Sequence, residues 1–245
     1  MKISVTPSLF DRIPGLCIGV VAVRAADNAA AVNMEAEAFR RRCCTEANLL
    51  LKMNPALAEK ELGDYREILS ASGVKEGRTA LEKVFAEYKE LLGIFIVEDA
   101  PEDMELLPQP KKATLDELAG SDALPRVSPI MDIVRGGMLK FHVEIHAYDM
   151  GNRKTPLEIR EAGRTFSVNL GDKVCTDDWL CHDEDAGAVT EDTENILVLI
   201  TGMKGNRRKV AAARNELARR MKSAFVRAVE VGWLEGKETE FTTEI

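Results

Sequence analysis

The sequence predicts an α+β fold in which helices, a β-rich region and a final helix follow one another along the chain. Three observations support this prediction. Residues 29–53 and 78–92 are rich in helix formers and place apolar residues at helical spacing. Between residues 140 and 201 the pattern changes to short apolar runs separated by turn residues. The regular alternation of strands and helices that is typical of parallel α/β sheets is missing.

The first half of the chain is expected to contain a pair of strands followed by helices. The Pro14-Gly15 turn separates the strands, and Asn54-Pro55 ends the first helix. The expected strands are Ser4–Leu9 and Leu16–Val23, and the expected helices span 29–53, 55–70 and 78–92. A Pro- and acid-rich stretch, Glu98–Lys112, is expected to be a linker or long surface loop, and Thr114–Ala119 a short helix.

The second half is expected to be built from short strands and one long helix. The expected strands are Lys140–His146, Leu157–Ile159, Thr165–Val168, Lys173–Thr176 and Ile196–Thr201. Turn residues separate them, for example Ala162-Gly163 and Leu170-Gly171-Asp172. A helix over residues 206–231 then closes the chain, with Val210, Leu217, Met221, Ala224 and Ala228 as its apolar stripe.

Length and composition indicate a globular protein of the cytoplasm. The chain has 245 residues, 45% hydrophobic and 30% charged, and no apolar run is long enough to cross a membrane. We expect residues 1–112, a strand pair with helices, and residues 113–245, a core with a C-terminal basic helix, to form one compact unit. The five cysteines are odd in number and form no C-x-x-C motif, which favours reduced, buried thiols.

Positive charge is concentrated near the C-terminus although the net charge is −8. Residues 203–229 hold nine basic side chains and one acidic one, so this segment carries +8 and the rest −16. The low acid content raises the hypothesis that this helix contacts the backbone of an RNA, and a solvated helix face is the alternative. The arginines expected to bind RNA are Arg207, Arg208, Arg214, Arg219 and Arg220.

Neither a metal nor a cofactor is expected. On a strand, His142 and His146 would be about 13 Å apart, whereas two histidines on one zinc each lie about 2 Å from the metal. Only one of them could share a metal with Glu144, so His142 is interpreted as a solvated strand histidine. The Gly-rich phosphate loops G-x-x-x-x-G-K-[ST] and G-x-G-x-x-G are absent, as are G-x-S-x-G and H-E-x-x-H.

Four short motifs between Pro125 and Met203 resemble one family. The segment 146–150, His-Ala-Tyr-Asp-Met, is similar to the H-A-[FY]-D-L signature of the B3/4 domain, the editing domain of the bacterial phenylalanyl-tRNA synthetase β chain. Residues 129–132 are similar to its N-P-L-V-D segment, residues 161–166 to its R-E-G-E turn, and residues 189–194 to its V-x-E-D-T turn. The other parts of a synthetase subunit are missing.

The resemblance implies a β-sandwich of short mixed strands flanked by helices, with a site between the two halves of the domain. In the synthetase this domain hydrolyses tyrosine wrongly attached to phenylalanine tRNA. The family's site histidine aligns with His146, and Leu199 takes the place of the glutamate that recognises the tyrosine hydroxyl. Val134 aligns with a site threonine, and Asp183-Glu184-Asp185 replaces a Gly-Gly loop. The substrate-binding residues expected from the resemblance are Val134, Arg135, Asn169 and Leu199.

Two functions remain open. One is a free-standing deacylase that hydrolyses the ester of a misacylated tRNA, with His146 positioning water or substrate. The other is a binding module that holds an amino acid or related metabolite without chemistry, which the apolar Leu199 and Val134 favour. A structural role for His146 in a reused fold is the third interpretation.

Overall fold

The computed structural model describes residues 1–29, 32–53, 60, 80–91, 124–151, 155–163, 165–176, 188–203 and 205–244. The helix expected at 55–70, the loop at Glu98–Lys112 and the short helix at Thr114–Ala119 lie outside these residues. So do Cys181 and the segment Asp183–Asp185.

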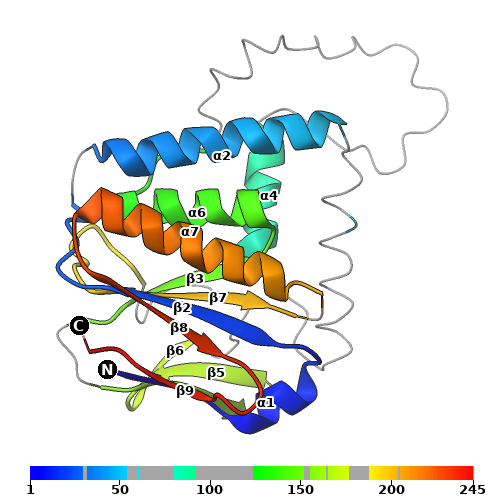
Figure 1. Cartoon of the computed structure of the whole chain (residues 1–245), viewed down its shortest axis with the longest axis vertical. Coiled ribbons are helices and arrows are strands. Elements are labelled where there is room, and N and C mark those ends of the chain that lie inside the picture. The colour runs from blue at the N-terminus through cyan, green and yellow to red at the C-terminus, as the bar shows by residue number, and fades with distance from the viewer. Residues whose placement is uncertain are drawn as a thin grey trace.

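The fold is α+β and layered, with helices stacked on one of two facing sheets (Figure 1). The four-stranded sheet is antiparallel, with strand order β3 (Glu144–Asp149), β7 (Ile196–Gly202), β2 (Cys17–Val23) and β8 (Val229–Leu234). The five-stranded sheet is mixed, with order β6 (Lys173–Thr176), β5 (Thr165–Leu170), β4 (Leu157–Ala162), β1 (Lys2–Val5) and β9 (Glu240–Thr242).

Five helices occur in the described part of the chain: α1 (Pro7–Arg12), α2 (Met34–Met53), α4 (Ala80–Leu91), α6 (Pro129–Phe141) and α7 (Arg207–Phe225). Figure 1 shows α6 and α7 lying on the four-stranded sheet and α2 crossing above them. None of the helices in the described ranges is long and apolar enough to span a bilayer.

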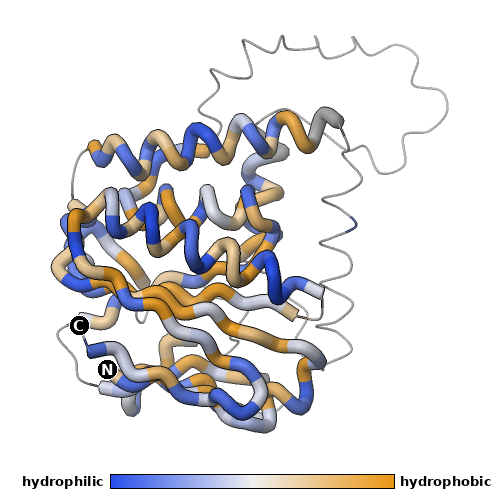
Figure 2. Tube along the Cα trace, in the orientation of Figure 1, coloured by the Kyte–Doolittle hydropathy of each residue, from blue (hydrophilic) through white to orange (hydrophobic). Residues whose placement is uncertain are grey.

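The four-stranded sheet has a hydrophobic core on each face. On β2, Val21 and Val23 pack toward the helices, whereas Val20 and Ala22 pack toward the five-stranded sheet. A strand that is covered on both sides has no polar face, which is why β2 and β7 are buried at every position. Figure 2 shows these strands as largely hydrophobic, whereas the helices carry many hydrophilic positions.

Helix α6 was not predicted, and it takes up Lys140 and Phe141, the first two residues of the expected strand Lys140–His146. The Ser128 hydroxyl accepts a hydrogen bond from the Met131 amide at 3.4 Å, and Pro129 occupies the first turn. His142 ends the helix in the left-handed conformation with φ 53° and therefore lies before β3, not on a strand. Gly137 obscured the helix in the sequence, but a Cβ there would come within 2.8 Å of Leu217, so the glycine lets α6 approach α7 closely.

Two further expectations are corrected at the ends of the chain. The strand predicted at Ser4–Leu9 stops at Val5, because Pro7 starts α1. The final helix stops at Phe225, before the predicted end at residue 231, because Val226 adopts the left-handed conformation and turns the chain into β8. Val210, Leu217 and Met221 face the core as expected, whereas Ala228 lies beyond the helix.

Both sheets combine strands from the two ends of the chain. β1 pairs in parallel with β4 and antiparallel with β9, and β2 lies between β7 and β8. The Met1 amino group also donates a hydrogen bond to the Thr243 carbonyl at 2.8 Å. The strands of segments 1–112 and 113–245 therefore share the same cores.

Candidate ligand-binding site

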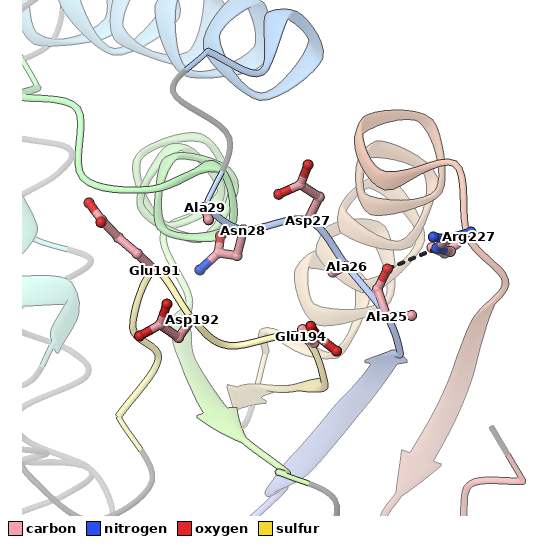
Figure 3. A pocket seen from close by; sticks show the side chains of 9 residues that line it. All are labelled: Ala25, Ala26, Asp27, Asn28, Ala29, Glu191, Asp192, Glu194 and Arg227. Carbon is pink, nitrogen blue, oxygen red and sulfur yellow. Dashed lines mark hydrogen bonds between the residues drawn. The ribbon is translucent and has the colours of Figure 1, made fainter.

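A pocket of about 560 Å³ opens at the end of the four-stranded sheet where β2 ends and β7 begins (Figure 3). Its lining comes from the segment after β2, from the turn before β7 and from the end of α7. The lining residues are Ala25, Ala26, Asp27, Asn28, Ala29, Glu191, Asp192, Glu194 and Arg227. Segments that are more than 150 residues apart in the sequence thus form one concave surface.

Asn28 joins three of the elements that surround the pocket. This side chain is only 2% exposed. Its Nδ2 donates to the Thr190 carbonyl at 2.7 Å, and its Oδ1 accepts from the Ile130 amide in the first turn of α6 at 3.0 Å. A buried amide with both ends bonded holds its surroundings in one arrangement. Asn28 therefore fixes the segment after β2 against the turn before β7.

Thr193 holds the turn itself. Its hydroxyl accepts a hydrogen bond from the Thr190 amide at 2.9 Å and lies 3.2 Å from Asp149 Oδ2 at the end of β3. The Ala26 amide donates to the Glu194 carbonyl at 2.8 Å and closes the other side. These bonds hold the backbone of the turn, while its carboxylates are exposed and line the pocket.

The pocket is strongly acidic. Asp27, Glu191, Asp192 and Glu194 contribute four carboxylates, and Arg227 contributes one guanidinium. Arg227 Nε donates to the Ala25 carbonyl at 2.8 Å, which anchors the guanidinium at the rim. Figure 3 shows Arg227 on the opposite side of the pocket from Glu191 and Asp192. Such a surface attracts an organic cation, and its one arginine offers a partner to an anionic group on the same molecule.

A smaller pocket of about 270 Å³ adjoins the first one and shares Asn28, Ala29 and Glu191 with it. Its remaining lining is Arg126, Val127, Ser128 and Pro129, at the start of α6. The concave surface thus continues from the acidic end toward a second arginine. Among the described residues, no three His, Cys, Asp or Glu side chains are arranged to hold a metal ion.

His146 lies elsewhere, in the middle of β3. It is 3% exposed and pairs in register with Leu199 of β7, so the two side chains are cross-strand neighbours. Side chains alternate along β3, so His146 lies on the same side of the strand as Tyr148. The two rings are stacked with their centroids 6.5 Å apart. Because Tyr148 packs in the core between the sheets, His146 faces that core as well. The two residues that the resemblance assigns to one site, His146 and Leu199, are thus brought together.

The other expected substrate-binding residues are not beside His146. Val134 is buried in the core between the helices and the four-stranded sheet. Arg135 pairs with Glu87, and its Nη1 donates to the Pro125 carbonyl at 3.1 Å. The Asn169 side chain donates a hydrogen bond to the Ser167 hydroxyl at 2.8 Å. Its neighbours on β5, Val168 and Leu170, pack in the core between the sheets, so Asn169 lies on the face of β5 that points away from this core.

The arginines of α7 make contacts within the protein. Arg207 pairs with Glu235 at 2.9 Å, and both Arg207 and Arg214 lie over the Trp233 ring, at 5.2 and 5.4 Å. Arg219 and Arg220 bind Glu216 at 2.7 and 3.0 Å, whereas Arg208 is exposed. Helix α7 covers the face of the four-stranded sheet opposite to that of His146. The basic helix and the histidine therefore do not share one surface.

The pocket residues were largely missed at the level of sequence. Asp27 and Asn28 belong to none of the motifs found in the sequence. Residues 189–194 were expected only as a turn similar to the V-x-E-D-T motif, although the three carboxylates in this turn indicate a charged surface.

None of the known protein-family models matches this chain, and no curated protein matches it significantly.

Proposed function

We propose that this protein binds an amino acid, or the aminoacyl group of a larger molecule, in the acidic pocket. The observation that carries the proposal is the 560 Å³ concave surface with four carboxylates and one arginine. An α-ammonium group is a compact cation that accepts several carboxylate partners. A free amino acid also presents a carboxylate, for which Arg227 is the partner on the opposite side of the pocket.

The family resemblance supports the same class of ligand. The turn that resembles the V-x-E-D-T motif of the B3/4 domain contributes Glu191, Asp192 and Glu194 to the pocket. B3/4 membership, and with it an aminoacyl ligand, is part of the proposal. Because the pocket carries a net negative charge, we expect the phosphate backbone of an RNA to lie away from its opening.

The test is binding of a panel of the twenty amino acids and their methyl esters, measured by calorimetry at low salt. We expect at least one member to bind, and its N-acetyl derivative to fail because acetylation removes the ammonium charge. Asp192→Asn and Glu194→Gln are each expected to weaken binding about two- to fivefold, the range for exposed ion pairs. Glu240→Gln, which removes an exposed carboxylate on β9, is the matched control.

Arg227→Gln separates the two ligand forms. If the ligand is a free amino acid, this substitution weakens the acid and leaves the methyl ester unchanged. If it is an aminoacyl ester, acid and ester respond alike. Equal binding of the N-acetylated and free forms, or no binding by any member of the panel, would overturn the proposal.

Hydrolysis of an aminoacyl-tRNA ester is a second candidate, and a separate observation favours it. Nε2 of His146 lies 3.4 Å from a carboxylate oxygen of Glu144, and both side chains are buried. A histidine next to a carboxylate is a common general base. Water would attack the ester carbonyl and release the free amino acid and the tRNA hydroxyl, with Leu199 as an apolar neighbour of the histidine.

This second candidate is tested by deacylation of a panel of aminoacyl-tRNAs that includes tyrosine attached to phenylalanine tRNA. Hydrolysis by the wild type that is lost in His146→Ala supports it. No hydrolysis of any member, together with no salt-dependent tRNA binding, would exclude it and leave the binding function alone.

A further inference from the structure

The protein itself does not neutralise the four carboxylates of the acidic pocket. No side-chain hydrogen bond or ion pair within the described ranges involves these groups, which belong to Asp27, Glu191, Asp192 and Glu194. Other surface carboxylates are paired with arginines, for example those of Glu216 and Glu235. Like charges around one concavity repel one another, and a bound cation relieves this repulsion. The pocket therefore favours positive charge in its ligand.

The carboxylates do not converge on one point. A bound calcium ion needs several oxygen ligands at about 2.3 to 2.6 Å, and no three His, Cys, Asp or Glu side chains of the described residues are arranged in this way. The pocket volume of about 560 Å³ lies in the range of small-molecule sites, about 300 to 1,000 Å³. These two observations favour an extended molecule with separated charges over a single metal ion.

The charges follow a fixed order along the pocket. Hydrogen bonds of the segment after β2 lead first to Arg227, then to the Glu194 backbone, and last to the start of the acidic turn. Figure 3 shows the same order, with Arg227 at one end, Asp27 and Glu194 in the middle, and Glu191 and Asp192 at the other end. The pocket thus has one positive end, a negative middle and a second negative end.

This order matches the charges of one class of amino acid. The α-carboxylate and the α-ammonium group are attached to the same carbon, so they lie close together. With the carboxylate on Arg227, the ammonium group meets the carboxylates in the middle of the pocket, Asp27 and Glu194. The side chain then extends toward Glu191 and Asp192, where only a second cation finds partners.

We infer that the ligand of the acidic pocket is an amino acid whose side chain carries a positive charge, such as lysine or arginine. The inference rests on the proposed function, because it names the class of amino acid that the pocket binds. Glu191 and Asp192 are the residues that determine this specificity. A neutral side chain would leave both carboxylates without a partner, and an acidic side chain would be repelled by them.

The experiment compares lysine with norleucine by calorimetry at low salt. The two amino acids have the same methylene stem, and norleucine lacks only the side-chain ammonium group. We expect lysine to bind about five- to twentyfold more tightly, the range for two exposed ion pairs. Arginine should exceed its neutral analogue citrulline in the same way. Both preferences should decrease as the salt concentration rises.

The double variant Glu191→Gln, Asp192→Asn assigns the preference to this end of the pocket. We expect it to weaken lysine about fivefold or more and norleucine less than twofold, whereas Glu194→Gln should weaken both ligands alike. The double variant Asp172→Asn, Glu240→Gln is the matched control. It removes two exposed carboxylates that do not line the pocket and changes the net charge by the same amount.

The possible results separate this inference from the proposed function. Norleucine that binds as tightly as lysine would overturn the inference and leave the proposed function standing, whereas no binding by any amino acid would overturn both. Two further results would also overturn the inference. One is binding of 1,5-diaminopentane, which lacks the carboxylate, as tightly as lysine. The other is displacement of lysine by an equal concentration of calcium chloride at constant ionic strength.

Discussion

Arg40 of α2 and Asp132 of α6 form an ion pair that is almost completely withdrawn from water. Arg40 Nε lies 3.6 Å from Asp132 Oδ2, and the two side chains are 4% and 2% exposed. The Val127 amide also donates to Asp132 Oδ1 at 3.3 Å, and the Arg40 guanidinium bonds the Leu124 carbonyl. The pair thus joins two helices and the segment that leads into α6, which lines the smaller pocket.

Removing one partner of this pair should cost far more than removing both. Arg40→Met leaves an uncompensated buried carboxylate, and we expect the free energy of unfolding to fall by about 3 to 5 kcal/mol. The double variant Arg40→Met, Asp132→Leu should recover a large part of this loss. Urea denaturation monitored by circular dichroism measures both. Additive effects of the two single substitutions would contradict the coupling.

The same pair predicts a pH dependence. Burial raises the pKa of Asp132, and the Val127 amide and Arg40 oppose this shift without cancelling it. A carboxyl group with a raised pKa binds more protons in the folded state, so its contribution to stability is lost as pH rises through that pKa. Arg40→Met removes one opposing charge. We therefore expect its stability deficit, measured by urea denaturation, to shrink as the pH is lowered from 7 toward 5.

Val226 is a site where a substitution should stabilise the protein. It ends α7 with φ 53° and ψ 43°, although it is β-branched and 82% exposed. A side chain that is branched at Cβ is strained in the left-handed region, whereas glycine is not. We expect Val226→Gly to raise the free energy of unfolding by about 1 kcal/mol. Val226→Ile is the control, and equal stability of the Gly and Ile variants would contradict this account of the strain.

Gly202 allows α7 to lie close to β7. A Cβ at this position would lie 2.3 Å from Cγ2 of Val210, a distance that no real contact shows. We expect Gly202→Ala to cost about 1 to 3 kcal/mol, the range for overpacking. Val210→Ala in the same chain should return part of that loss by removing the clashing methyl group, although alone it is destabilising. Thermal unfolding of the four proteins measures this compensation.

The buried thiols should be inert in the folded protein. Burial raises the pKa of the Cys17 thiol to about 11 and that of the Cys43 thiol to about 12. The reactive thiolate is therefore scarce at pH 8, and the side chains are inaccessible. In a Cys181→Ser background, we expect negligible reaction with a disulfide reagent until denaturant is added. Rapid reaction under native conditions would show that the protein opens locally around a buried cysteine.

The sequence predicted the elements that have a strong local pattern. β2 and β7 were evident as apolar runs, and the β4–β5 hairpin was evident from its turn, where Gly163 has φ 65°. Helix α6 and strand β8 were missed, because their identity depends on tertiary contacts. Two glycines weaken α6 as an isolated helix, and one strained valine at the end of α7 separates helix from strand.

The two candidate sites also differ in how far the sequence predicted them. His146 and Leu199, which the family resemblance assigns to one site, lie opposite each other in the β3–β7 register. The acidic pocket was not predicted, because Asp27, Glu194 and Arg227 meet only after three distant segments have folded. Local patterns contain no information about such a meeting. Glu144 was noted as a polar strand residue, but its contact with Leu81 spans 63 positions.

The placement of β1 and β2 has a consequence for synthesis on the ribosome. These strands occupy the first 23 residues, yet β1 awaits β4 and β9, and β2 awaits β7 and β8. Neither sheet is complete until β8 and β9 have emerged. Strands that pair over such long sequence separations fold slowly. Until they pair, they expose apolar side chains and unpaired backbone edges. We therefore expect the nascent chain to need chaperones until β8 and β9 have been synthesised.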